Sequence, residues 1–160
     1  MGTETTMTQT GATSSAAAEA GRYLGEAVEV AGWLYNLRKS GKIVFPILRD
    51  GTGILQCVAM KNALPEETFE QLKSLTQESS LIVTGKLRDE QRAPGGFELD
   101  VESAHIAQRG PEDHPYPSTP KAHGVDFLMD QRPLWIRSRL PPAILRVRQW
   151  ITQRLLGFFR

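Results

Sequence analysis

Residues Gly32–Gln56 read GWLYNLRKSGKIVFPILRDGTGILQ, and this stretch sets the fold class of the chain. Together with its flanks it contains three β-like runs: Glu26–Tyr35, Ile43–Arg49 and Ile54–Met60. A basic loop, Asn36–Lys42, joins the first two, and the glycines of Asp50–Gly53 accept the positive φ angles of a tight turn. The stretch therefore predicts a three-stranded meander. Pro46 cannot donate a ladder hydrogen bond, so we expect a bulge or an edge position there.

The spacing of the apolar residues changes after this meander. Leu64-Pro65-Glu66-Glu67 places a proline and two acids where the first turn of a helix favours them. Apolar residues then follow at three-residue steps: Phe69, Leu72 and Leu75. Strand-like text resumes at Leu81–Leu87 and at Phe97–Ile106. Three strands, a helix and two strands is the order of the OB-fold, so we predict a mainly β, five-stranded Greek-key barrel with its helix between strands three and four.

Composition shifts divide the chain into segments. The first residues are rich in Thr, Ser, Ala and Gly, and RGPEDHPYPSTP at Arg109–Pro120 holds four prolines. Pro141-Pro142 opens a final amphipathic helix, Ala143–Arg160, with an apolar stripe. The expected segments are a disordered tail, a barrel domain, a Pro-rich linker and a C-terminal helical segment: 1–22, 23–108, 109–122 and 123–160.

The overall composition excludes several classes of protein. Nineteen Lys and Arg against eighteen Asp and Glu give no global charge signal, so any nucleic-acid surface must be a local patch. The one cysteine, Cys57, excludes an intramolecular disulfide and is expected to be a buried thiol. No apolar run approaches the roughly 18 residues of a spanning helix, and the N-terminus lacks a signal or transit pattern. We expect a cytoplasmic protein without a membrane partner.

The chemistry of Gly32–Gln56 favours single-stranded nucleic acid. Cations in the first loop suit a phosphate backbone: Arg38, Lys39 and Lys42. The flat ring of Phe45 suits an unstacked base, and the Gln56 amide can read the edge of that base. Taken without any further evidence, Phe45 is better explained as a core residue and Gln56 as a solvated strand position.

Several stretches of the sequence resemble a known family. Gly32–Gln56 is similar to the N-terminal anticodon-binding barrel of class IIb aminoacyl-tRNA synthetases, the enzymes for Asp, Asn and Lys. The segment LTQESSLIVTGKLRDEQRAPGGFELD (Leu75–Asp100), followed by YPSTPKAHGVDFLMDQRPLWIRS (Tyr116–Ser138), resembles the asparaginyl enzymes in particular. The resemblance covers nearly all of Tyr23–Arg160.

The resemblance implies a partner and site residues. The partner is tRNA, bound through its anticodon loop. Phe45 matches a phenylalanine on which the central U stacks, Gln56 matches a glutamine that reads its edge, and Arg38 matches an arginine that contacts the loop. Glu98 is a weaker candidate for contact with the neighbouring base. Acidic residues alternate along this strand at positions 98, 100 and 102. This pattern equally predicts that the Glu98 carboxylate faces solvent.

The resemblance also implies what a longer relative would contain. The full-length enzymes attach asparagine to tRNA with ATP and Mg²⁺ during translation, and they are expected to be homodimers. Residues 123–160 match only the start of their catalytic domain, inside the first class II motif. The second and third motifs, which hold ATP, are absent from this sequence. We expect a fragment or a truncated relative.

No other group of residues in the sequence has the spacing of a phosphate-binding, metal-binding or catalytic site. Gly51-Thr52-Gly53 and Gly95-Gly96 lack the spacing of a phosphate loop. The three histidines are scattered and lack metal-ligand spacing: His105, His114 and His123. We therefore predict no catalytic residue, no cofactor-binding residue, no metal ligand and no enzymatic activity from this chain alone.

Two other functions stay open at this stage. A stand-alone OB-fold can bind single-stranded nucleic acid without sequence preference, although such proteins tend to carry several stacking aromatic residues. Alternatively, the chain is a protein-interaction module that docks through its apolar and basic C-terminal helix.

Overall fold

The computed structural model of the chain describes residues 13–14, 17–112, 123–138 and 140–159. They belong to two compact units, residues 1–114 and residues 115–160.

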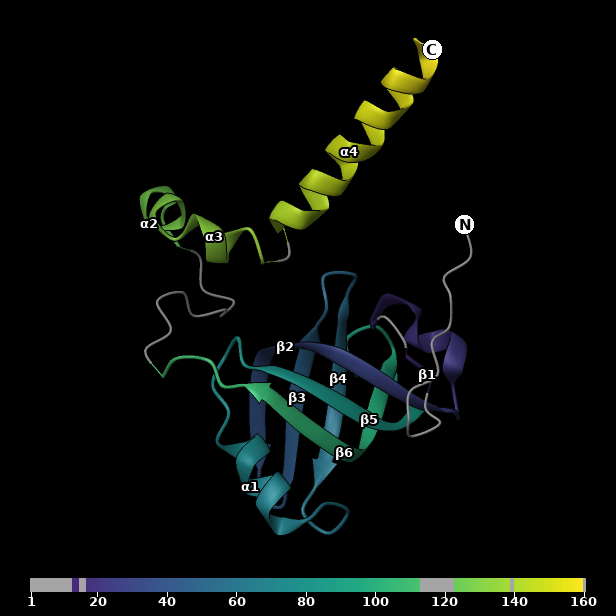
Figure 1. The fold of residues 1–160 in the computed structure, drawn as a ribbon, viewed down its shortest axis with the longest axis vertical. Coiled ribbons are helices and arrows are strands. Elements are labelled where there is room, and N and C mark those ends of the chain that lie inside the picture. The colour runs from purple at the N-terminus through teal and green to yellow at the C-terminus, as the bar shows by residue number, and fades with distance from the viewer. Residues whose placement is uncertain (1–12, 15–16, 113–122, 139, 160) are drawn as a thin grey trace. The chain divides into compact units, whose positions relative to one another are not determined.

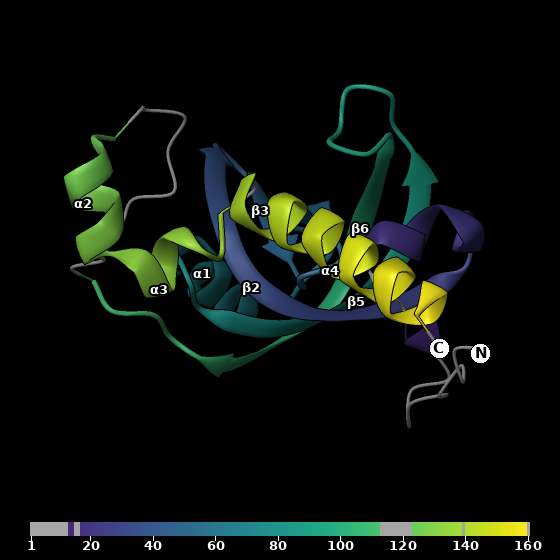
Figure 2. The ribbon, with the colours of Figure 1, turned by 90° about the horizontal axis from the view of Figure 1, so that it is seen from above.

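The first unit is a closed barrel of five long strands (Figures 1 and 2). These strands are β2 (Ala27–Ser40), β3 (Ile43–Arg49), β4 (Ile54–Met60), β5 (Ser80–Asp89) and β6 (Phe97–Gln108). β2 pairs with both β3 and β5, and β4 pairs in parallel with β6, so the sheet closes on itself. Helix α1 (Glu66–Lys73) lies between β4 and β5 in the chain. The predicted OB-fold order is confirmed.

Alternation along the strands fills the barrel. Every second residue of β3 points inward, where Val44 and Leu48 are fully buried. In β4 the inward residues Leu55, Cys57 and Ala59 are buried, and Val58 is buried as well. Helix α1 contributes Phe69 and Leu72, which join the same hydrophobic core. Cys57 is also fully buried, as the sequence predicts. The residues between the inward positions are left on the outer face of the barrel.

Strand β2 is longer than the sequence predicts. It continues through Ser40, so most of the expected basic loop is strand, and the turn to β3 is reduced to Gly41-Lys42 with Gly41 at φ 58°. The register shifts between Leu34 and Asn36, which marks a β-bulge. This bulge lets the first half of β2 pair with β5 and the second half with β3 (Figure 2).

Pro46 departs from the expectation of a bulge or an edge position. β3 lies between β2 and β4, and Pro46 pairs in register with Leu37 of β2. The ladder to β4 pairs Val44 with Ala59 and resumes at Ile47–Gln56 with the same register. The missing N–H is therefore accommodated by a gap in the β3–β4 ladder, while the bulge lies on β2.

The described part of the N-terminal segment is ordered against the barrel. Thr13–Ser14 form a short strand, β1, that pairs in parallel with β2, and Ala17–Tyr23 form the 3₁₀ helix η1. Ala20 is fully buried, and the Asp50 carboxylate accepts a hydrogen bond from the Ala17 amide at 2.6 Å. The expected disordered tail is therefore wrong for residues 13–14 and 17–22, whereas residues 1–12 and 15–16 lie outside the described part.

The start of the expected linker is also attached to the barrel. The Gly110 amide donates to the Ser79 hydroxyl at 2.9 Å, and the Thr76 hydroxyl donates to the Gly110 carbonyl at 2.8 Å. The Arg109 guanidinium donates to the Ser74 hydroxyl at 3.1 Å. Residues 113–122, the rest of the expected linker, lie outside the described residues.

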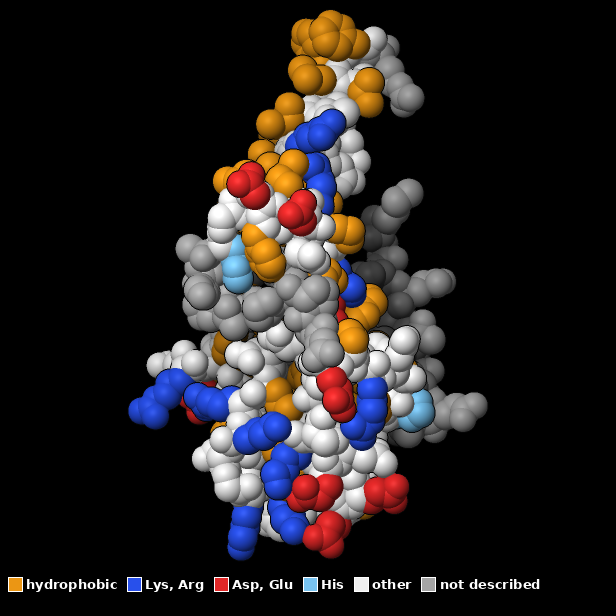
Figure 3. All heavy atoms as spheres, turned by 90° about the vertical axis from the view of Figure 1, so that its left-hand side faces the viewer, with side chains coloured by type: hydrophobic (Ala, Val, Ile, Leu, Met, Phe, Trp, Pro, Cys, Tyr) orange, Lys and Arg blue, Asp and Glu red, His pale blue; other side chains and the backbone are white. Residues whose placement is uncertain are grey.

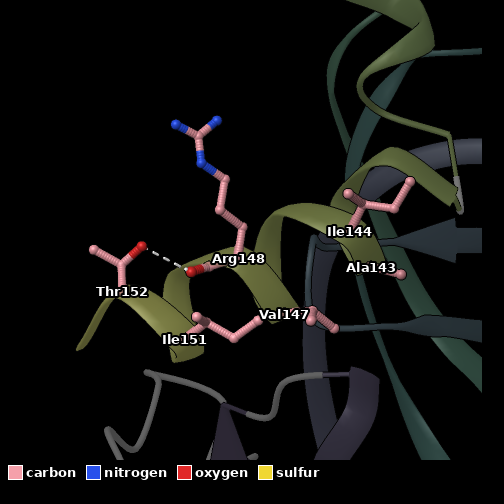
Figure 4. A pocket seen from close by; sticks show the side chains of 6 residues that line it. All are labelled: Ala143, Ile144, Val147, Arg148, Ile151 and Thr152. Carbon is pink, nitrogen blue, oxygen red and sulfur yellow. Dashed lines mark hydrogen bonds between the residues drawn. The ribbon is translucent and has the colours of Figure 1, made fainter. Parts of the chain in front are cut away.

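The described residues of the second unit form three helices: α2 (Val125–Asp130), α3 (Arg132–Trp135) and α4 (Leu140–Phe158). The expected final helix is confirmed, although it begins at Leu140 and accommodates Pro141 and Pro142 in its first turn. Figure 4 shows Val147 and Ile151 on one side of α4, with Arg148 pointing away from them. Within the described residues, no helix is both long and apolar enough to cross a membrane.

Candidate nucleic-acid interface

Phe45 and Arg38 form the first part of the candidate interface. Val44 and Pro46 are buried, so Phe45 between them lies on the outer face of β3, where it is partly exposed. Arg38 is its direct partner across the β2–β3 ladder and is itself exposed. The guanidinium carbon lies 4.6 Å from the centre of the ring, within cation–π distance. The two residues present a flat ring with a positive charge beside it.

Gln56 lies on the same outer face, one strand further along the sheet. It is paired with Ile47, which is two residues after Phe45 on β3. Side chains two residues apart on a strand share a face, so Phe45 and Gln56 are diagonal neighbours, typically about 7–8 Å apart. The ring and the amide are thus held on adjacent strands of a rigid sheet.

Glu98 lies beside Gln56 on β6, the next strand of the barrel. The two residues are partners in the parallel β4–β6 ladder, and the Gln56 amide nitrogen donates to one oxygen of the Glu98 carboxylate. The other carboxylate oxygen accepts from the Arg88 guanidinium at 2.6 Å. Only 6% of the Glu98 side chain is exposed, so the expectation of a solvent-facing carboxylate is wrong. The cross-strand partners Gln56 and Arg88 cover the Glu98 side chain.

Arg88 belongs to the site, although sequence reasoning did not single it out. It is the antiparallel partner of Glu98 on β5, and its Nε also lies 3.2 Å from the Asp100 carboxylate. Within the sequence Arg88 is one of several charges before Gly95-Gly96. The register of the β5–β6 hairpin would identify Arg88, because it pairs residue 88 with residue 98. This register can be derived only when the ends of both strands are known.

Further cations surround this face. Lys39 and Lys42 are exposed at the β2–β3 turn, and Figure 3 shows several Lys and Arg side chains on one side of the barrel unit, with Asp and Glu side chains beside them. Lys61 donates to the Glu66 carboxylate at 2.8 Å. This hydrogen bond and the attraction of the two charges raise the pKa of Lys61 and lower that of Glu66. The arrangement suits a polyanion that passes over the ring.

Comparison with known proteins decides the family. Residues 28–107, half of the chain, match the family described as "OB-fold nucleic acid binding domain". The chain belongs to this family. The match begins in β2 and ends in β6, so it covers the barrel that carries Arg38, Phe45, Gln56 and Glu98.

The relatives that this chain matches include asparagine–tRNA ligases. That of Koribacter versatilis is 55% identical over 88% of this chain, and that of Thermus thermophilus is 46% identical over 88%. Both matches cover 32% of the relative, so the chain spans about a third of the length of the curated relatives it matches. The resemblance to asparaginyl-tRNA synthetases is confirmed.

Solved structures agree with this OB-fold assignment. Asparaginyl-tRNA synthetase from Pyrococcus horikoshii, complexed with asparaginyl-adenylate, matches with a TM-score of 0.71 at 39% identity. The match covers 83% of this chain and 32% of that one. A putative aspartyl-tRNA synthetase from Leishmania major shares the fold, with a TM-score of 0.80 at 22% identity over 99% of this chain and 34% of that one.

The thiol and imidazole groups of the described residues are buried or are not part of this interface. Burial, with a smaller effect of the Glu98 charge, raises the pKa of the Cys57 thiol far above its usual value, so this thiol is inert. His105 is exposed, His123 stacks on Phe127, and His114 lies outside the described residues. The described residues contain no group of three His, Cys, Asp or Glu side chains that could hold a metal ion.

Proposed function

We propose that this chain is the anticodon-binding region of an asparaginyl-tRNA synthetase. In this proposal the central base of the anticodon, a U, stacks on Phe45, and the Gln56 amide reads its edge. Arg38 binds the loop beside the stacked base. The observation that carries the proposal is the placement of Arg38, Phe45 and Gln56 on one outer face of three adjacent strands.

The chemistry of each group fits its proposed role. Stacking of a base on an aromatic ring contributes roughly 1–3 kcal/mol and needs a partly exposed ring, as Phe45 has. An amide donates and accepts at once, which matches the donor and acceptors on the edge of uracil. The exposed guanidinium of Arg38 supplies a positive charge for phosphate.

The proposal extends to the full-length parent enzyme. In this proposal the parent attaches asparagine to tRNA with the use of ATP. It acts in the cytoplasm and forms a homodimer. The apolar face of α4 supports the dimer, because the resemblance assigns this helix to the class II motif that builds the dimer interface. Its apolar side chains are exposed in the second unit: Ile144, Val147, Ile151, Leu155 and Phe158.

ATP and Mg²⁺ do not fit the residues described here. Mg²⁺ is usually held by one or two carboxylates and by the phosphates of its substrate. The acidic residues at the candidate interface, Glu98 and Asp100, are already engaged by the Arg88 cation. We therefore assign no step of the parent reaction to residues of this chain.

Binding of short RNAs tests the proposal. The purified chain should bind an anticodon stem–loop with a central U more tightly than the same stem–loop with a central A. A random single strand of equal length serves as the control. Equal affinity for all three RNAs would support a barrel that binds single strands without sequence preference, and would contradict an anticodon reader.

A further inference from the structure

The Gln56 amide is held on one side by an acceptor. A carboxylate accepts hydrogen bonds but cannot donate them while it is ionised. The Glu98 carboxylate therefore fixes the nitrogen of the Gln56 amide toward β6. The amide oxygen then faces the other way, and among the described residues none donates a hydrogen bond to it. Gln56 thus presents a free acceptor in one fixed orientation.

Glu98 is itself held in place by two partners. Arg88 binds the second carboxylate oxygen at 2.6 Å, and the side chain of Glu98 is almost fully buried. Arg88 is fixed in turn by Asp100, 3.2 Å from its Nε. Both partners approach the Glu98 carboxylate as donors, Gln56 at one oxygen and Arg88 at the other. A chain of polar contacts thus runs from Asp100 through Arg88 and Glu98 to Gln56.

From this geometry we infer that Glu98 and Arg88 are positioning residues that lock the orientation of the Gln56 amide and so determine which base it accepts. The inference rests on the proposed function. A base stacked on Phe45 with its ring nitrogen facing the amide oxygen must carry a hydrogen on that nitrogen. Uracil has this hydrogen at N3, whereas cytosine has a bare acceptor there. A reversed amide would favour cytosine.

Cytosine is the sharpest comparison, because it has the same ring size as uracil and should stack similarly on Phe45. The locked amide should prefer a central U over a central C by about tenfold, because cytosine would leave two acceptors facing each other without a hydrogen between them. Glu98→Gln keeps the shape of the side chain but can donate as well as accept, so the amide of Gln56 is free to turn. The preference should then fall to within roughly threefold of equality.

The experiment measures the U-to-C ratio of dissociation constants for stem–loops with the wild type, Glu98→Gln and Arg88→Met. Glu102→Gln is the matched control, because it makes the same charge change at an exposed position of the same strand. Arg88→Met removes a half-exposed partner and should also move the ratio toward one, which keeps the test available if Glu98→Gln is poorly folded. Glu102→Gln should retain the wild-type ratio.

The Gln56→Ala variant distinguishes a positioning role of Glu98 from direct contact between Glu98 and the base. In Gln56→Ala the U-to-C ratio should already be near one, and adding Glu98→Gln should not change it. A further change would show that Glu98 reads the base itself and would overturn the inference. So would a wild-type ratio retained by both Glu98→Gln and Arg88→Met. A wild type that distinguishes neither U from C nor U from A contradicts the proposed function, and the base-reading role of the lock fails with it.

Discussion

The guanidinium carbon of Arg38 lies 4.6 Å from the centre of the Phe45 ring, and the two residues are direct partners across the β2–β3 ladder. The ring is therefore covered on one side by a cation that is already in place before any ligand arrives. A base that stacks on Phe45 and a phosphate that approaches Arg38 must lie next to each other. This pairing gives separate predictions for the two residues.

Replacing Phe45 by alanine should weaken binding of an anticodon stem–loop by about 1–3 kcal/mol, because the stacking surface is lost. Phe45→Trp should retain most of the affinity, since it keeps an aromatic face. Trp33→Leu is a suitable control, because Trp33 is another exposed aromatic residue on β2 but lies opposite Arg49, four residues along β3 from Phe45. Titration by fluorescence anisotropy measures these effects. Equal losses from Phe45→Ala and Trp33→Leu would contradict a specific stacking site.

Replacing Arg38 by alanine should weaken all stem–loops similarly and reduce their salt dependence. Removing one phosphate contact to a single strand lowers the slope of log K against log salt by about 0.7. The slope is measured from dissociation constants at several salt concentrations. Lys86→Ala, an exposed cation on β5 near the other end of β2, should leave the slope unchanged. An unchanged slope in Arg38→Ala would show that this residue does not contact phosphate.

The buried pair of Arg49 and Glu78 should stabilise the barrel in a way that exposed pairs do not. Their side chains are 12% and 9% exposed, and the Arg49 guanidinium donates to the Glu78 carboxylate at 2.8 Å. Glu78→Gln leaves a buried cation without its counter-charge, so we expect a loss of about 3 kcal/mol in the free energy of unfolding, measured with urea.

The pair of Lys61 and Glu66 provides the control for this prediction, because its contact distance is also 2.8 Å but both side chains are exposed. Glu66→Gln should leave the free energy of unfolding nearly unchanged. If Glu78→Gln also left the free energy of unfolding unchanged, the ion pair of Arg49 and Glu78 would make no net contribution to stability.

Asp50 should make the attachment of η1 sensitive to acid. Burial alone would raise the pKa of Asp50, but hydrogen bonds from the Ala17 amide, from the Thr52 hydroxyl and amide and from the Gly53 amide lower it below its ordinary value of 3.8. Its contribution to stability is therefore complete above pH 3.8 and is lost as the pH falls through the lower folded-state pKa.

Amide hydrogen exchange in η1 measures this effect. Protection of η1 should fall in acid in the wild type, whereas Asp50→Asn should show weak protection of η1 at neutral pH as well. Asp89→Asn, an exposed aspartate at the end of β5, serves as the control. Protection of η1 that stays the same in Asp50→Asn would refute this role of Asp50.

The sequence predicts the fold well where one face of an element is apolar. The sequence predicts the bounds of β3 and β4, and the polarity of Gln56 predicts its outward position. The outward position of Phe45 does not follow from the pattern, because residues 43–48 of β3 are all apolar. Helix α1 is equally well predicted, because Phe69 and Leu72 occur at helical spacing.

Other parts of the fold depend on contacts that lie far apart in the chain. Asn36–Ser40 is polar and lacks a strand pattern of its own, and it is extended because it pairs with β3. Glu98 looks solvent-facing by alternation, and its burial follows from Gln56 on β4 and Arg88 on β5. Ala17 and Ala20 are too small to signal burial, and η1 is fixed by Asp50, 33 residues away from Ala17.

The central claim, that this barrel reads the middle base of an anticodon, is tested most directly by one ratio. Dissociation constants for stem–loops with a central U and a central A are measured for the wild type and for Gln56→Ala at two salt concentrations. The wild-type ratio should favour U clearly and stay constant with salt, because base contacts are less sensitive to ions than phosphate contacts. In Gln56→Ala it should approach one. A wild-type ratio of one at both salt concentrations would contradict the claim.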